Sequence, residues 1–137
     1  MIQSMYRGKS KETHEWVFGS LVQVSGSGSL AISYLDDNGH IKMQEIEKET
    51  AGMFTGCDDD HETDRGYSQL WSGDIIELQY KGELITCKIE YEICGFMLVS
   101  DLFDDGFIWM SDLVESDGLY NWIPDSKLIG NIHSHEN

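Results

Sequence analysis

The chain has 137 residues, of which 40% are hydrophobic and 25% charged. These values are typical of a soluble globular protein with room for one domain. Its longest apolar run, Gly95–Val99, is far shorter than the roughly 20 residues of a membrane-spanning helix. The N-terminus shows no apolar segment of the signal-peptide kind. We therefore expect a soluble cytoplasmic protein without membrane association.

The chain is strongly acidic, with 25 Asp and Glu against nine Lys and Arg and a formal net charge of −16. Direct binding of nucleic acid is not expected, because basic side chains supply most of the affinity for phosphate backbones. Residues 1–11 carry three basic residues and no acid, whereas residues 90–137 carry ten acids and one lysine. Such a surface can simply keep the protein soluble. The alternatives are a surface that meets a basic partner or imitates nucleic acid, or attraction between basic and acidic ends of two subunits.

Strand patterns dominate the first third of the chain. Residues 15–24 are rich in β-branched and aromatic side chains, residues 30–35 alternate, and residues 40–46 resume after the turn Asp36-Asp37-Asn38-Gly39. An Asn-Gly pair between two apolar runs is a strong hairpin signal. This region therefore predicts a β-hairpin preceded by another strand.

The clearest pattern lies further along the chain. Residues 76–80 and 85–93 alternate between apolar and polar side chains around Lys81-Gly82, which predicts a half-buried antiparallel pair. Short strands are also expected at 96–99, with both faces buried, and at 107–110 and 128–132. Residues 111–121 fit neither strand nor helix spacing.

Residues 50–73 show almost no periodicity and are dense in Gly and Asp. Many short strands with Gly-rich turns predict a mainly β protein, built as a small barrel or a rolled antiparallel sheet. We expect one compact unit over residues 1–137. Within it, an N-terminal β subdomain at 1–50 and a second one at 70–137 would be joined by an irregular acidic loop at 51–69.

The potential metal ligands fit no known site. Cys57, Cys87 and Cys94 form no C-x₂-C pair, so we expect three buried or half-buried thiols without a disulfide framework. His133 and His135 would share one face of a strand but lack a third ligand nearby. The run 58–64 has Thr63 where a calcium loop of the EF-hand kind needs Gly, and it has Gln69 where that loop needs Glu. We interpret this run as an exposed acidic loop and expect no metal.

No catalytic or cofactor motif is complete. Residues 26–31 match G-x-G-x-x-A, yet a strand pattern follows where a dinucleotide site needs a helix. There is no G-x-S-x-G, and the aromatic residues are interpreted as core packing or as a surface between subunits. We therefore expect no enzyme activity and no cofactor.

Gly73 and Asp74 stand directly before the strand at 76–80. Gly73 can adopt backbone angles that other residues avoid, and the Asp74 carboxylate can accept hydrogen bonds from nearby backbone N–H groups. The predicted role of the pair is structural, fixing the angle at which the chain enters the sheet.

Four segments in this order resemble motifs of the YopX-type phage proteins. They are Tyr6-Arg7-Gly8-Lys9-Ser10 with 15–21, then Gly52-Met53-Phe54-Thr55-Gly56-Cys57-Asp58-Asp59, then Trp71-Ser72-Gly73-Asp74-Ile75-Ile76, and finally Leu128-Ile129-Gly130-Asn131-Ile132-His133. The chain departs from the family at Met53, where Gln is usual, and at Cys57, where Leu is usual. The stretch from His61 to Gln69 is also longer than the short turn that the family has between its Asp and Gly-Asp elements.

The resemblance implies a phage or prophage protein in a bacterial host, with an SH3-like barrel in the 70–137 region and self-association as a homo-oligomer. The family has no established activity, so no catalytic, cofactor or metal residues are transferred. The motif residues with an expected structural role are Gly52, Thr55, Gly56, Asp58, Gly73, Asp74, Gly130 and Asn131. The leading hypothesis is a non-enzymatic binding protein. The alternative is an acidic inhibitor that mimics DNA or blocks a basic host protein.

Overall fold

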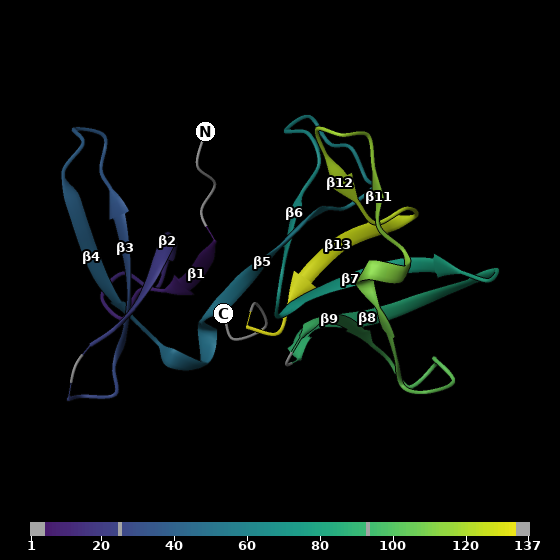
Figure 1. Ribbon diagram of the computed structural model, residues 1–137, viewed down its shortest axis with the longest axis horizontal. Helices are drawn as coiled ribbons and strands as arrows, with labels where there is room; N and C mark the ends of the chain where they lie inside the picture. Colours follow the sequence, from purple (N-terminus) through teal and green to yellow (C-terminus); the bar gives the residue numbers. More distant parts are fainter. Residues whose placement is uncertain (1–4, 25, 93, 134–137) are drawn as a thin grey trace. The chain divides into compact units, whose positions relative to one another are not determined.

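A computed structural model describes residues 5–24, 26–92 and 94–133 (Figure 1). These residues form β-strands and two short 3₁₀ turns and contain no α-helix, which confirms the predicted mainly β class. None of them forms a helix long and apolar enough to cross a membrane. The chain divides between Phe54 and Thr55 into two compact units, which are described in turn.

The first unit is a rolled antiparallel sheet. Its strands are β1 (Tyr6–Lys9), β2 (Trp16–Gln23), β3 (Leu30–Leu35) and β4 (Ile41–Ile46), paired in chain order. The chain after β1 returns to β4, where Ser10 bridges Ile46 and the Lys11 N–H donates to the Glu45 carbonyl at 2.9 Å. The 3₁₀ turn η1 (Lys48–Thr50) follows, and the start of β5 (Gly52–Asp58) pairs with β1.

Two glycines allow these strands to roll tightly around a small core. A Cβ on Gly8 would collide with the side chain of Ile46, and a Cβ on Gly19 would collide with the carbonyl oxygen of Ser33 on β3. Ile32 and Ile46 are fully buried. A side chain at either glycine would therefore force the strands apart.

The predicted hairpin at 30–46 is confirmed by the β3 and β4 pairing, which extends from Leu30 opposite Ile46 to Leu35 opposite Ile41. Its loop is held by Asp36, whose Oδ1 accepts the N–H groups of Asn38 at 2.9 Å and His40 at 2.8 Å.

The second unit contains a five-stranded antiparallel sheet in the order β10, β9, β8, β7, β13. The strands are β7 (Asp74–Tyr80), β8 (Glu83–Glu92), β9 (Gly95–Val99), β10 (Phe107–Trp109) and β13 (Ser126–Asn131). The sheet is compatible with an open SH3-like barrel and is not closed.

Alternation in β7 and β8 builds the core of this unit, as predicted. Ile76 lies opposite Cys87 and Leu78 opposite Ile85, and all four are buried. The prediction that β9 is buried on both faces is wrong. Leu98 is the one fully buried residue of this strand, and its other four residues are half-buried. The buried cluster comprises Cys57, Leu70, Ile76, Leu78, Ile85, Cys87, Ile89, Leu98, Phe103, Met110 and Ile123.

The hairpin between β7 and β8 turns through Lys81 and Gly82, both with positive φ, 51° for Lys81 and 83° for Gly82. A positive φ is uncommon for a residue with a side chain. The Lys81 Nζ lies 5.3 Å from the centre of the Tyr80 ring, a cation–π contact.

The expected irregular loop at 51–69 is wrong in its first half, because β5 occupies Gly52–Asp58. Its partners are β1, β6 (Gln69–Trp71) and β12 (Asn121–Trp122), and β12 also pairs with β11 (Glu115–Ser116). Within the strand, Thr55 Oγ1 donates to the Leu70 carbonyl at 2.8 Å. The segment shows no apolar alternation because partners distant in sequence hold it in place.

Candidate functional site

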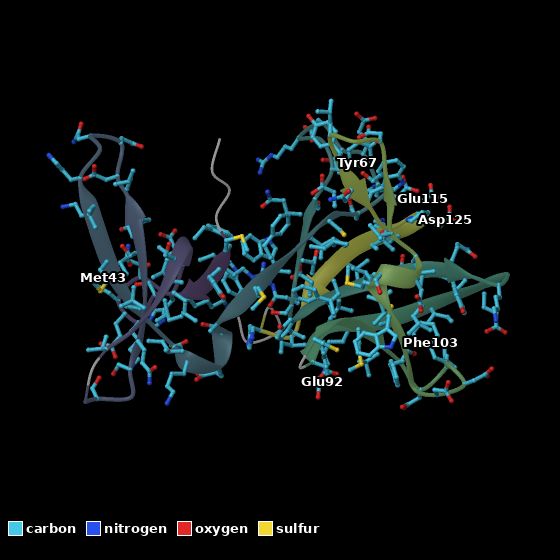
Figure 2. All side chains as sticks on the ribbon, viewed as in Figure 1. Met43, Tyr67, Glu92, Phe103, Glu115 and Asp125 are labelled. Atoms are coloured by element: carbon cyan, nitrogen blue, oxygen red, sulfur yellow. The ribbon has the colours of Figure 1, made fainter. Side chains whose placement is uncertain are left out.

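A hollow of about 620 Å³ lies in the second unit where β5 ends. Carboxylates, aromatic rings and one amide line it, and we call it the acidic hollow. Figure 2 shows Tyr67, Glu115 and Asp125 at the end of the second unit where β11 and β12 lie. The lining residues are Asp58, Asp59, Asp60, Tyr67, Asp117, Tyr120, Asn121 and Trp122.

Asp59 has a structural task in this hollow. Its side chain is nearly fully buried; Oδ1 accepts the Ser68 N–H and Oδ2 accepts the Leu128 N–H, both at 2.9 Å. A buried carboxylate of this kind is stable only with such partners. Asp59 therefore ties the end of β5 to the chain before β6 and to β13.

Asp60 and Asp117 also use their carboxylates on the protein's own backbone. Asp60 Oδ2 accepts the Asp125 N–H at 2.8 Å. Asp117 Oδ1 accepts the N–H groups of Tyr120 at 2.8 Å and Leu119 at 2.9 Å. These hydrogen bonds lower the pKa of Asp117, and the bond from the Tyr120 N–H has the largest effect. Asp117 thus fixes the loop that brings Tyr120 to the hollow.

Asp58 differs from its neighbours. Its side chain is half-buried, and none of the residues that the structure describes donates a hydrogen bond to its carboxylate or forms an ion pair with it. Burial raises the pKa of Asp58, and the nearby charge of Asp59 raises it further. Asp58 is therefore the carboxylate of the hollow of which neither oxygen accepts a hydrogen bond from the described residues.

The expectation of an exposed acidic loop over 58–64 needs correction. Residues 60–64 are exposed, but Asp58 is half-buried and Asp59 is buried, because β5 continues to Asp58 and Asp59 holds three segments together. The part of the chain that the structure describes contains no group of three or more His, Cys, Asp or Glu residues placed to hold a metal ion. His133 is half-buried, and His135 lies outside the described residues.

A second hollow of about 600 Å³ is mainly apolar. Phe96, Trp109, Met110 and Val114 line it, together with Thr55, Gly56, Cys57, Cys94, Gly95, Ser111, Ser116 and Asn121. Nothing in this lining supplies a charge, so it offers packing area without electrostatic attraction.

The cysteines are all free, and two of them are buried. Burial raises the pKa of the Cys57 thiol, and it raises that of Cys87 to about 12. The expectation that all three would be buried or half-buried is wrong for Cys94, which is exposed at the turn between β8 and β9.

Gly73 and Asp74 lie where the chain passes from β6 to β7. Gly73 has a φ of 91°, and the buried Asp74 accepts the Trp71 N–H with its Oδ2 at 2.8 Å. This bond fixes the chain as it leaves β6 and enters β7, so the pair shapes the sheet and lies outside both hollows.

The other expected motif residues are spread over the fold. Gly52 pairs with Arg7 of β1. In β13, Gly130 follows a shift of register that lies between Leu128 and Gly130, and Asn131 pairs with Asp74 of β7. Thr55 and Gly56 line the apolar hollow. Only Asp58 of the expected set lines the acidic hollow.

Sequence reasoning missed the aromatic partners of Asp58. Tyr67 comes from the segment between β5 and β6, whereas Tyr120 and Trp122 come from the loop after β11 and from β12. An available signal was the pair of aromatic residues Tyr120 and Trp122, two positions apart and shortly after Asp117. Its pairing with Asp58 is a parallel contact between distant segments, which no local pattern predicts.

No protein-family model matches this chain, and no curated protein matches it. The resemblance to YopX-type proteins thus stays a prediction from the four motifs.

Proposed function

We propose that the chain is a non-enzymatic binding protein that holds a basic protein partner at the acidic hollow. The observation that carries this proposal is Asp58, a half-buried carboxylate without a donor among the described residues, placed beside three aromatic side chains. A carboxylate next to aromatic faces suits a cation, since the ring faces attract positive charge. Lys or Arg side chains of a partner supply that cation.

The other carboxylates of the hollow support binding rather than proton transfer. Asp59, Asp60 and Asp117 each accept backbone N–H bonds of 2.8–2.9 Å. A general acid or base needs to reach a substrate proton within hydrogen-bond distance and a second group to work with. Here three of the four carboxylates hold the protein's own backbone, which leaves Asp58 as the one carboxylate of the hollow that accepts no hydrogen bond from the described residues.

The proposal includes the YopX type, with a phage or prophage origin, a place in the bacterial cytoplasm and self-association. Its support is the set of four motifs in order, residues 6–10 with 15–21, and then 52–59, 71–76 and 128–133. Light scattering at tens of micromolar tests the self-association, and a strictly monomeric species would contradict it.

The binding itself is tested by calorimetric titration with a short arginine- and lysine-rich peptide at low salt. Asp58→Asn removes the open charge, and Asp104→Asn is a matched control, because Asp104 is exposed, belongs to the same unit and does not line the acidic hollow. We expect Asp58→Asn to weaken binding about tenfold, the range of one charge-assisted hydrogen bond. Asp104→Asn should stay close to the unmodified protein. An equal effect of both variants would contradict a localised site.

The second candidate is an acidic inhibitor that mimics DNA or covers a basic host protein, favoured by the net charge of −16. In this case the affinity would come from charge spread over the surface. Replacing any single acid with a neutral residue would then weaken binding only slightly, and by a similar factor at each position. Competition against a DNA duplex for a basic DNA-binding protein distinguishes the two. A DNA mimic displaces the duplex, and its affinity falls steeply with salt.

A further inference from the structure

We propose that the acidic hollow selects an arginine side chain over a lysine side chain. In this arrangement Asp58 would accept both arms of the guanidinium, while the rings of Tyr67, Tyr120 and Trp122 would cover its faces. The inference rests on the proposed function and names the partner's chemistry at the same site. Charge complementarity defines the occupant, because the lining holds four carboxylates and no Lys or Arg.

The first reason is the state of the Asp58 oxygens. Asp59 and Asp117 already direct their oxygens at backbone N–H groups, whereas Asp58 has both oxygens available among the described residues. A free carboxylate matches the planar fork of a guanidinium with two parallel hydrogen bonds. An ammonium group is a point charge and gains no such second bond from geometry.

The second reason is the aromatic lining. Guanidinium groups stack on ring faces more often than ammonium groups do. The acidic hollow offers three such rings to an incoming side chain.

The third reason is hydration. Asp58 is half-buried, so its cationic partner must give up water to reach it. A guanidinium is more weakly hydrated than an ammonium and therefore loses less on entering such a site. A hollow of about 620 Å³ leaves room for the planar group and its stem.

The test uses three acetylated and amidated peptides, Gly-Ser-Gly-X-Gly-Ser-Gly, in which X is arginine, lysine or citrulline. Citrulline keeps the planar shape of arginine but lacks its charge. Amide and indole N–H shifts in nuclear magnetic resonance titrations give the affinity and show whether Trp122 responds. We expect the arginine peptide to bind about tenfold more tightly than the lysine peptide, and the citrulline peptide to bind weakest.

The variants separate the possible failures. Asp58→Asn should remove the arginine preference, whereas Asp104→Asn should keep it. Equal affinity for arginine and lysine peptides, still dependent on Asp58, would overturn the selectivity and leave the proposed function standing. No shift at the hollow with either peptide would overturn both. The citrulline comparison uses the unmodified protein, so the outcome does not depend on how a variant folds.

Discussion

Asp58 and Asp59 are neighbours in the chain, yet one carboxylate is open and the other is fully engaged. The Asp59 carboxylate accepts the backbone N–H groups of Ser68 and Leu128 at 2.9 Å, while the Asp58 carboxylate accepts no hydrogen bond from the described residues. Successive residues of an extended chain point in opposite directions. At the end of β5, two neighbouring carboxylates that line the same hollow therefore meet different surroundings, and only that of Asp59 reaches backbone N–H groups.

Replacement of Asp59 should therefore destabilise the protein. Asp59→Ala removes the acceptor of the Ser68 and Leu128 N–H groups and of the more distant His61 N–H at 3.5 Å, and each close bond lost costs about 1–3 kcal/mol. We expect the free energy of unfolding of the second unit to fall by about 2–4 kcal/mol, measured by urea denaturation. Asp60→Ala, which removes one exposed acceptor, is the control and should cost less. Equal losses would contradict the assigned role of Asp59.

Replacement of Asp58 should have the opposite effect on stability. The raised pKa means that the ionised carboxylate is less favourable in the folded chain than in the unfolded one. This destabilisation is present above the folded pKa and disappears as the pH falls below the unfolded value of about 3.9. Asp58→Asn should thus raise the melting temperature at pH 7, and the difference from the unmodified protein should shrink on acidification. A variant less stable at neutral pH would show that Asp58 supports the fold.

Gly19 is expected to be essential for the rolled sheet of the first unit. Gly19→Ala places a Cβ against the backbone carbonyl of Ser33, which cannot move without shifting β3. Overpacking of this kind costs about 1–3 kcal/mol. Ser20→Ala, at the exposed neighbouring position, should change the free energy of unfolding by less than about 0.5 kcal/mol. If the two variants unfold alike in urea, β2 and β3 do not approach as closely as described.

Thiol labelling should distinguish the three cysteines. Cys94 is exposed, whereas burial raises the pKa of Cys57 and raises that of Cys87 to about 12. Only the thiolate reacts quickly with a disulfide reagent. At pH 8 we expect one fast thiol per native chain and two more after unfolding in guanidinium. Mass spectrometry should place the fast label on Cys94. Fast labelling of Cys87 would contradict its place in the core.

Much of the fold follows from local patterns. The alternation in β7 and β8 reflects the burial of Ile76, Leu78 and Ile85 on one face, and such patterns are readable because each strand pairs with its neighbour in sequence. β5 has no such pattern, because two of its partners, β1 and β12, are remote in sequence and because it carries Gly52 and Gly56. The short strands β11 and β12 are also set by tertiary pairing, which overrides weak local preference.

The candidate site was less predictable than the fold. Asp58 belongs to a motif recognised in the sequence, but its surroundings come from segments about 60 residues later in the chain, near Tyr120 and Trp122. Two adjacent aspartates look identical in sequence. The N–H groups of Ser68 and Leu128 and the deeper burial that they accompany distinguish Asp59 from Asp58.

The turn between β7 and β8 has a consequence for redesign of this hairpin. Lys81 adopts a backbone conformation that asparagine or glycine would adopt more easily, but its ammonium group rests on the Tyr80 ring. Replacing it with asparagine relieves the backbone and forfeits the ring contact, two changes of about 1 kcal/mol each and of opposite sign. A consensus substitution chosen from turn statistics alone would gain little at this position.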